Sequence, residues 1–331
     1  MGAPVPVNGE SAVRRVAVVG AGLMGHGIAL ELALAGLDVR LHSRSADSVA
    51  RGLATARRTL ERLSALGVID AGRIAPAMAR IGGTDDLTEA AGEAELVIET
   101  VYEDVAVKRA TFEALDRAAP PGAILASNTS TLPLAAFSAG VRPDRVMAAH
   151  YGNPPYLVPV VELVRGAGTS DATVGRVRAF FRAMGKTPVV IARELPGFIV
   201  NRLQAALVRE AMWLVQDGYV TPSDVDAIVR GNLGRRWAAA GPFEVMDLAG
   251  VDLYRTGCRA LFPLLSGAGA PPPMVEALVA AGATGVRAGR GFHAWTPAAA
   301  EALWRRLTKT LALLAGTGPG DDDPQAGGDG C

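Results

Sequence analysis

The stretch Val16-Ala-Val-Val-Gly-Ala-Gly-Leu-Met-Gly25 decides the fold of this chain. Its first four residues are fully apolar, which predicts a strand buried on both faces of a parallel sheet. Glycines follow at the spacing G-x-G-x-x-G, and residues 23–34 then show helical periodicity. These glycines permit a tight turn, the approach of a pyrophosphate and close packing of helix on strand. The stretch therefore predicts a dinucleotide site, formed by Gly20, Ala21, Gly22, Leu23, Met24 and Gly25.

Strand and helix patterns alternate through the following residues. Further strands are predicted at residues 39–41, 96–98, 123–126, 146–149 and 187–191, and helices at 48–66 and 107–118. Such alternation implies right-handed crossovers and a doubly wound parallel sheet. We therefore predict an α/β protein with an N-terminal Rossmann domain over residues 14–194, preceded by a flexible leader at residues 1–13.

The pattern changes after residue 194. Residues 199–265 show only helical periodicity, and Thr221-Pro222 has the features of a helix start. We predict an all-helical C-terminal domain over residues 195–295. Residues 296–314 predict one more helix, and the low-complexity tail from residue 316 to 331 predicts disorder.

The composition excludes several classes of protein. The chain has 331 residues, with 33 Lys+Arg against 33 Asp+Glu, and 50% of its residues are hydrophobic. At roughly 100–200 residues per domain, this length predicts two domains. The zero net charge lacks the positive field that a nucleic-acid binder needs.

Cysteine, histidine and apolar segments exclude further classes. Two cysteines are too few for a disulfide framework, and the four histidines are scattered without the spacing of a zinc site. The N-terminus lacks the apolar middle of a signal peptide, and no stretch approaches the roughly 20 apolar residues of a membrane span. We expect a cytoplasmic protein that binds neither a structural metal nor a membrane.

The end of the second predicted strand bears on the choice of cofactor. An NAD enzyme of this fold usually has an acidic residue there, which accepts hydrogen bonds from the ribose hydroxyls. Here the chain reads His42-Ser43-Arg44, and Arg44 is suited to hold the 2′-phosphate of NADP. We expect NAD or NADP, with a slight preference for NADP. The alternative is that Arg44 is solvated and NAD binds without the acid.

Five further motifs occur in a recognisable order. They are residues 96–104 (LVIETVYED), 127–130 (SNTS), 150–155 (HYGNPP), 160–162 (VVE) and 196–201 (PGFIVN). Together with the glycine turn, they resemble the 3-hydroxyacyl-CoA dehydrogenase family over roughly residues 14–295. The branches of that family include L-gulonate dehydrogenase/lambda-crystallin and carnitine dehydrogenase types. The resemblance implies a Rossmann domain followed by a helical domain for substrate and dimerisation, and hence a homodimer.

The resemblance also implies catalytic roles. His150 matches the catalytic base, Glu162 the carboxylate that pairs with it, and Asn201 an asparagine near the reacting carbonyl; Ser130 matches a serine that contacts cofactor and substrate. The chemistry agrees, because imidazole exchanges protons near neutral pH and a tautomer-fixing carboxylate assists it. Independently, Glu162 is an acid in an apolar run, and an unpaired buried acid is costly, so a partner such as His150 is expected.

Other positions carry implied binding roles. Glu103 and Lys108 match cofactor-contacting positions, and Asn153 lies beside the base, where it is expected to contact cofactor and substrate. Arg51 and Arg58 lie on the arginine-rich helix at 48–66. Such a helix is usually a solvated face, but the matching helix of the family helps to bind CoA. Ser43-Arg44 and Tyr151-Gly152 depart from the family pattern, which leaves cofactor and acyl preference open.

These observations predict NAD(P)-dependent oxidation of an L-3-hydroxyacyl-CoA to the 3-ketoacyl thioester, or the reverse. An acyl-carrier-protein thioester is equally compatible with the motifs. A polyol or hydroxycarboxylate such as L-gulonate is an alternative, because residues 233–238 and 241–244 resemble the gulonate branch. A second alternative is a nucleotide-binding structural or regulatory protein without activity.

Overall fold

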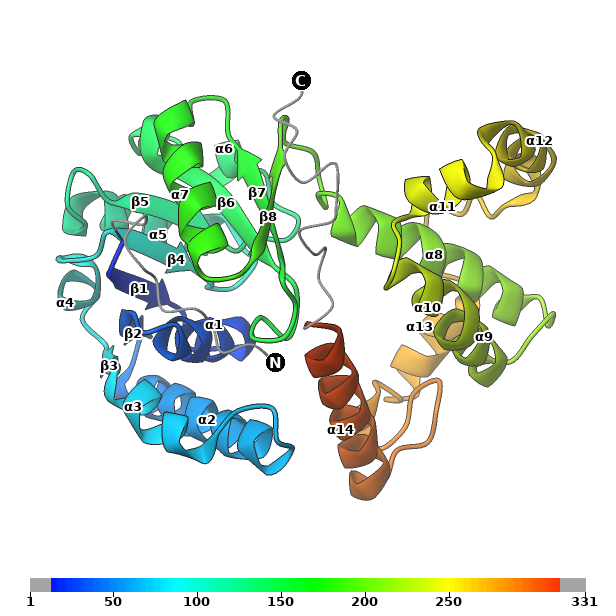
Figure 1. Cartoon of the computed structure of the whole chain (residues 1–331), viewed down its shortest axis with the longest axis horizontal. Helices are drawn as coiled ribbons and strands as arrows, with labels where there is room; N and C mark the ends of the chain where they lie inside the picture. Colours follow the sequence, from blue (N-terminus) through cyan, green and yellow to red (C-terminus); the bar gives the residue numbers. More distant parts are fainter. Residues whose placement is uncertain (1–12, 316–331) are drawn as a thin grey trace. The chain divides into compact units, whose positions relative to one another are not determined.

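The computed structural model describes residues 13–315. The expectations for the leader and for the tail fall outside these residues, except at Val13. The chain forms two compact units (Figure 1), one of which comprises residues up to Ile199 together with Leu307 onward. The other unit is Val200–Arg306.

The first unit is built on one eight-stranded sheet. Its strand order is β3-β2-β1-β4-β5-β6-β7-β8. In chain order the strands are β1 (Arg15–Val19), β2 (Asp38–His42), β3 (Ile81–Thr84), β4 (Leu96–Glu99), β5 (Ile124–Ser127), β6 (Val146–Tyr151), β7 (Val160–Arg165) and β8 (Thr187–Ile191). The order reverses direction at β1, which is the topological switch point where open α/β sheets bind ligands. The predicted Rossmann fold is confirmed.

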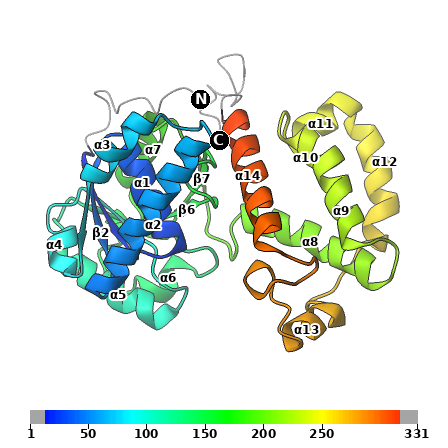
Figure 2. The ribbon, with the colours of Figure 1, turned by 90° about the horizontal axis from the view of Figure 1, so that it is seen from below.

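Helices cover both faces of this sheet. They are α1 (Leu23–Leu34), α2 (Ala46–Ala65), α3 (Ile74–Ala79), α4 (Leu87–Ala91), α5 (Val105–Ala118), α6 (Leu134–Phe137) and α7 (Asp171–Ala183). One apolar core lies under α1, α2, α3 and α7, and a second lies under α4, α5 and α6. Figure 2 shows the α1–α3 layer and the α4–α6 layer on opposite sides of the strands. Burial on both faces explains why β1 and β4 are continuous apolar runs.

The sheet differs from the prediction in two respects: it contains two strands that the sequence did not predict, β3 and β7, and it is not parallel throughout. We predicted a parallel sheet, but β7 runs antiparallel to β6, and β8 runs parallel to β7. The connection between β6 and β7 is short, and a parallel crossover needs a dozen or more residues. The antiparallel pair places His150 directly opposite Glu162 in the register.

The second unit consists of helices joined by turns. They are α8 (Val200–Gln216), α9 (Pro222–Ile228), α10 (Gly234–Trp237), α11 (Pro242–Ala249), α12 (Val251–Leu261), α13 (Pro273–Ala280) and most of α14 (Pro297–Leu314). The predicted start at Thr221-Pro222 is present, because Thr221 caps α9 and exchanges hydrogen bonds with Asp224 in a capping box. Among residues 13–315, no helix is long and apolar enough to cross a membrane.

Candidate functional site

The carboxyl ends of five parallel strands meet at one edge of the sheet. β1, β2, β4, β5 and β6 are parallel neighbours, so the residues that follow them lie along this edge. The glycine turn follows β1, Ser43-Arg44 follows β2, Glu103 follows β4 and Ser130 follows β5. His150 is the second-last residue of β6. The topology therefore gathers most of the predicted site residues of this unit on one edge.

His150 and Glu162 form a buried pair across β6 and β7. The Nδ1 atom of His150 lies 2.7 Å from Oε2 of Glu162, within hydrogen-bond distance. The two side chains are 10% and 3% exposed. A carboxylate at Nδ1 favours the tautomer that carries its proton there, which leaves Nε2 as the nitrogen free to exchange a proton. The pairing expected from the sequence is present.

A turn at the end of this unit holds the second oxygen of Glu162. The backbone N–H of Ile199 donates to Oε1 of Glu162 over 2.8 Å. Gly197 and Phe198 both adopt positive φ, at 78° and 46°, a conformation that is unfavourable for phenylalanine. The Phe198 ring lies 5.6 Å from the His150 ring, centroid to centroid. Both oxygens of Glu162 are therefore engaged, and the imidazole is packed on one side.

The glycine turn fits a bound dinucleotide. Gly20 has φ +112°, and a Cβ on Gly25 would lie 1.6 Å from the carbonyl oxygen of Gly20, so this turn requires both glycines. A Cβ on Gly22 would meet nothing within 4 Å, which leaves open space at the start of α1. The first turn of α1 has no acidic residue and no side-chain cap. Its N–H groups are therefore available to a pyrophosphate.

The end of β2 carries a cation instead of an acid. Ser43 is half-buried and Arg44 is exposed. The Arg44 guanidinium lies 5.9 Å from the centre of the Tyr102 ring, a distance typical of a cation–π contact. Tyr102 belongs to the loop after β4 and is itself exposed. The arrangement presents a guanidinium and an aromatic face at the position where this fold binds the adenosine ribose.

Glu103 organises the loop that carries Ser130. Its Oε1 accepts hydrogen bonds from the backbone N–H groups of Ser130 and Thr131, both over 2.9 Å, and from the hydroxyl of Thr129 over 2.7 Å. The N–H of Leu132 donates to the same oxygen at 3.3 Å. These donors lower the pKa of Glu103 to about 2, against the opposing effect of burial. The carboxylate therefore fixes the backbone of residues 129–132.

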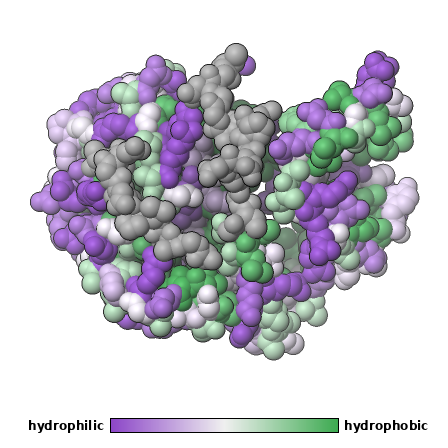
Figure 3. Space-filling model, viewed as in Figure 1, coloured by the Kyte–Doolittle hydropathy of each residue, from purple (hydrophilic) through white to green (hydrophobic). Residues whose placement is uncertain are grey.

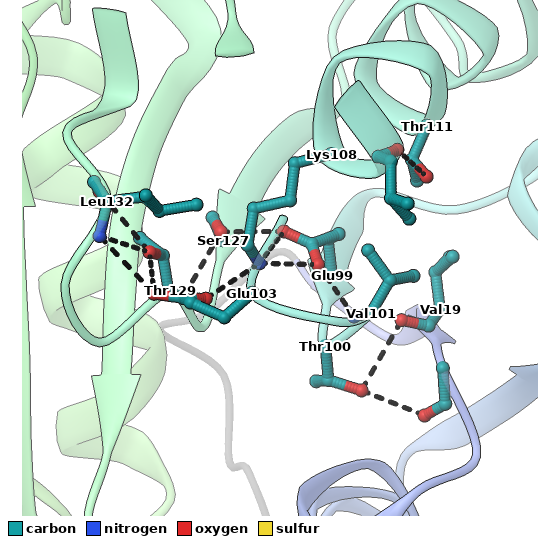
Figure 4. Close-up of polar contacts among 12 residues, drawn as sticks. Val19, Glu99, Thr100, Val101, Glu103, Lys108, Thr111, Ser127, Thr129 and Leu132 are labelled. Carbon is teal, nitrogen blue, oxygen red and sulfur yellow. Dashed lines mark hydrogen bonds and ion pairs between the residues drawn. The ribbon is translucent and has the colours of Figure 1, made fainter. Parts of the chain in front are cut away.

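Lys108 lies beneath this loop as a buried counter-ion (Figure 4). Its side chain is 1% exposed, and Nζ lies 2.9 Å from Oε1 of Glu99 and 3.3 Å from Oε2 of Glu103. Ser127 donates to Oε2 of Glu99 over 2.6 Å. Asp104 caps α5 by accepting from the N–H of Val107, which places Lys108 in the first turn. Burial raises the pKa of Glu99, and the Lys108 ammonium opposes this rise.

The remaining predicted residues lie on other elements. Asn153 is exposed in the loop after β6, and Asn201 is the second residue of α8, in the helical unit. Arg51 and Arg58 are exposed on α2, where they donate to Ser48 and to Thr55 respectively. The binding roles of these residues stay predictions, as do those of Glu103 and Lys108.

Sequence reasoning missed several polar residues of this edge. Glu99 and Ser127 are fully buried. Oδ1 of Asn128 accepts a hydrogen bond from the backbone N–H of Tyr151 over 2.9 Å. Asn128 thereby ties the loop after β5 to the end of β6. Glu99 gave the same signal as Glu162, an acid at the end of an apolar run, and a search for its partner would have found Lys108 nine residues later.

Comparison with known proteins agrees with this architecture. Residues 15–195 match the family description "3-hydroxyacyl-CoA dehydrogenase, NAD binding domain", and residues 197–295 match its C-terminal domain. A similar protein is 5-formyl-3-hydroxy-2-methylpyridine 4-carboxylate 5-dehydrogenase of Mesorhizobium japonicum, 34% identical over 91% of this chain and 97% of that one. A probable 3-hydroxybutyryl-CoA dehydrogenase of Bacillus subtilis is 34% identical over 85% and 97%.

A solved structure is also similar along most of the chain. It is that of 5-formyl-3-hydroxy-2-methylpyridine 4-carboxylic acid 5-dehydrogenase, an NAD⁺ dependent dismutase, with TM-score 0.83 and 32% identity over 91% of this chain and 97% of that one. The chain belongs to the 3-hydroxyacyl-CoA dehydrogenase family. It is an NAD(P)-dependent oxidoreductase of that type.

The low pKa of Glu103 predicts a pH-dependent contribution to stability. Folding lowers this pKa from 4.5 to about 2, so the unfolded chain binds more protons on Glu103 between these values. The stabilisation is then complete above about pH 4.5 and is lost as the pH falls towards about 2. We expect Glu103→Gln to have a lower free energy of unfolding than the wild type at pH 7. This difference in the free energy of unfolding should shrink as the pH falls below 4.5.

Denaturant unfolding at a series of pH values measures this difference in the free energy of unfolding. Glu113→Gln is a matched control, because Glu113 is an exposed carboxylate on α5, the helix that follows Glu103. This control should follow the wild type at every pH. A wild-type advantage over Glu103→Gln that stays constant down to pH 2 would contradict the role given to this carboxylate.

Proposed function

We propose that the chain catalyses the NAD(P)-dependent interconversion of an L-3-hydroxyacyl-CoA and its 3-ketoacyl thioester. The observation that carries the proposal is the buried His150–Glu162 pair, with Nδ1 and Oε2 2.7 Å apart. A histidine oriented by a carboxylate is suited to remove a hydroxyl proton. The pair belongs to the unit that also carries the glycine turn. Membership of the family supports the thioester substrate.

The proton step follows from the orientation of His150. In the oxidation, the hydroxyl proton of the substrate passes to Nε2 of His150 as the carbonyl forms. The hydrogen on C3 leaves with its electron pair as a hydride. A dinucleotide held at the glycine turn, residues 20–25, would supply the acceptor for this hydride. The proton already on Nδ1 stays hydrogen-bonded to Glu162, whose charge stabilises the imidazolium that results. Reduction runs through the same groups in reverse.

Ser130 and Asn201 would position the reacting oxygen. A hydroxyl and an amide can both donate hydrogen bonds to the negative charge that develops on this oxygen. The Ser130 backbone is fixed by Glu103, which supports a positioning role for its side chain. Arg51 and Arg58 are exposed on one helix, a placement compatible with contact to the phosphates of CoA.

We also propose that the cofactor site accepts NADP, with Arg44 as the residue that holds the 2′-phosphate. Ser43 and Arg44 lie at the end of β2, where an acidic residue would accept hydrogen bonds from the ribose hydroxyls of NAD. The contact of Arg44 with the Tyr102 ring supports this proposal, because it holds the guanidinium beside the expected ribose site.

A second candidate substrate is a small aromatic or aliphatic carboxylate that carries a hydroxyl or carbonyl group. The relative from Mesorhizobium japonicum, named for a pyridine carboxylate, matches 91% of this chain, against 85% for the probable 3-hydroxybutyryl-CoA dehydrogenase. The proposed chemistry of His150 is the same for either substrate. The candidates differ in whether α2 contacts a CoA moiety.

Absorbance of the reduced nicotinamide at 340 nm provides the test. Wild type should turn over 3-hydroxybutyryl-CoA, and His150→Ala should lower kcat by about 10²–10⁴-fold. Glu162→Gln should lower it as well, because the amide provides no charge to stabilise the imidazolium. His293→Ala is the matched control, since His293 Nε2 also contacts a carboxylate, Asp226, at 3.0 Å in the other unit.

The assay separates the alternatives. It is run with NAD and NADP, and with a pyridine carboxylate and L-gulonate beside the thioester. Turnover of the carboxylates alone would replace the acyl-CoA proposal with the second candidate. A His150→Ala enzyme with nearly full rate would contradict the assignment of the base, whichever substrate is used.

We propose further that the chain acts as a homodimer through its helical unit. Within residues 200–306, a stretch described without gaps, Ala283 is the one buried residue. Large apolar side chains are exposed instead, and Phe243 at 77% and Leu248 at 85% are examples on α11. Figure 3 shows hydrophobic residues at the surface over these helices. Apolar patches of this kind mark interfaces, and a second copy of the chain would supply the missing core.

The dimer predicts a concentration-dependent unfolding temperature. Because two chains separate when a dimer unfolds, Tm should rise with protein concentration. Light scattering should give twice the chain mass of 34.1 kDa. A monomer of 34.1 kDa at micromolar concentration, with a Tm independent of concentration, would contradict the proposal.

A further inference from the structure

The loop between β6 and β7 joins the two strands that carry His150 and Glu162. It comprises residues 152–159 and contains Asn153, the polar side chain nearest in sequence to His150 on this loop. Internal hydrogen bonds are few, with the N–H groups of Leu157 and Val158 both donating to the carbonyl of Pro154 at 3.1 Å. Three of its eight residues are prolines, which have no N–H to donate. The loop therefore depends on contacts from outside itself.

Lys186, the residue just before β8, supplies such contacts. Its Nζ donates to the carbonyl of Pro155 over 2.5 Å and to that of Val158 over 2.8 Å. The residue is 9% exposed, and its ammonium also pairs with Oε1 of Glu31. Three acceptors thus take the three protons of the ammonium group. Hydrogen bonds from a charged donor are about twice as strong as neutral ones.

Glu31 brings the helix of the glycine turn into the same cluster. It lies in α1, nine residues after Gly22, and its side chain is 14% exposed. Burial raises the pKa of Glu31 to about 7, with the Lys186 ammonium acting in the opposite direction. Loss of that ammonium would raise the pKa of Glu31 further, which favours the neutral carboxyl group. Replacing Lys186 therefore need not leave an unpaired charge inside the protein.

The loop also packs directly on α1. A Cβ on Gly27 would lie 2.8 Å from Cγ of Pro155 and 3.5 Å from the Tyr156 ring, so glycine permits this approach. One turn further along the helix, Glu31 reaches Lys186. The loop is thus attached to α1 by packing at Gly27 and by the ammonium of Lys186.

We propose that Lys186 and Glu31 are positioning residues, which hold the loop of residues 152–159 that carries Asn153 and joins the strands of His150 and Glu162. Lys186 donates hydrogen bonds to two carbonyls of the loop. Glu31 pairs with the Lys186 ammonium and so ties it to α1, the helix that begins at the glycine turn. This inference rests on the proposed function for its catalytic part, whereas the anchoring of the loop is testable without any substrate.

Hydrogen exchange of the full-length protein tests the anchoring. In Lys186→Met, the amides of Leu157 and Val158 should exchange about tenfold faster or more, because two charged hydrogen bonds to the loop are lost. The double variant Glu31→Gln/Lys186→Met, which buries no charge, should show the same effect. Arg73→Met is the matched control. Arg73 lines a cavity of about 370 Å³ together with Glu31 and Lys186, but it donates to the carbonyl of Leu34, outside the loop.

Kinetics tests the consequence for the proposed reaction. In Lys186→Met, kcat should fall about ten- to a hundredfold through loss of positioning, while the Kd of the dinucleotide stays within about twofold. Unchanged exchange in the loop would overturn the proposal, as would faster exchange with unchanged kcat. A wild type that turns over no thioester or carboxylate would refute the proposed function, while the exchange data would still decide the anchoring.

Discussion

One hydrogen bond between two buried groups, Nδ1 of His150 and Oε2 of Glu162, sets the constraint on which the site depends. It requires the antiparallel pairing of β6 and β7, because only that register places the two residues opposite each other. The pairing in turn requires the short loop of residues 152–159. The turn at Gly197-Phe198 places the N–H of Ile199 so that it donates to the other oxygen of Glu162. The backbone of this turn is strained at Phe198.

Two buried lysines help to fix the loops on either side of this pair. Loops at the carboxyl edge of a sheet expose backbone groups that need partners. Lys108 forms ion pairs with Glu99 and Glu103, and Glu103 accepts hydrogen bonds from the N–H groups of the loop that carries Ser130. Lys186 is paired with Glu31 and donates hydrogen bonds to carbonyls of the loop after His150. In each case a buried ion pair fixes a loop of irregular backbone, which gives precision to residues outside regular structure.

Local patterns in the sequence predict the Rossmann fold and the glycine turn, whereas the His150–Glu162 pair is predicted chiefly from the family resemblance. The glycine spacing fixes a turn, and an acid in an apolar strand demands a partner. β3 escaped prediction because Gly82 and Gly83 interrupt its apolar pattern. β7 also escaped prediction, and its direction depends on pairing that periodicity does not encode. Glu31 and Lys186 escaped because they are far apart in the sequence and meet only after α1 and β8 have packed.

Nuclear magnetic resonance of the ¹⁵N-labelled imidazole groups tests the central pair most directly, with His150→Ala to assign the signal. We expect the neutral His150 ring to carry its proton on Nδ1, in a strong hydrogen bond that Glu162→Gln weakens, with Nε2 unprotonated. A ring protonated on Nε2, or one whose signals do not respond to Glu162→Gln, would contradict this structure of the site.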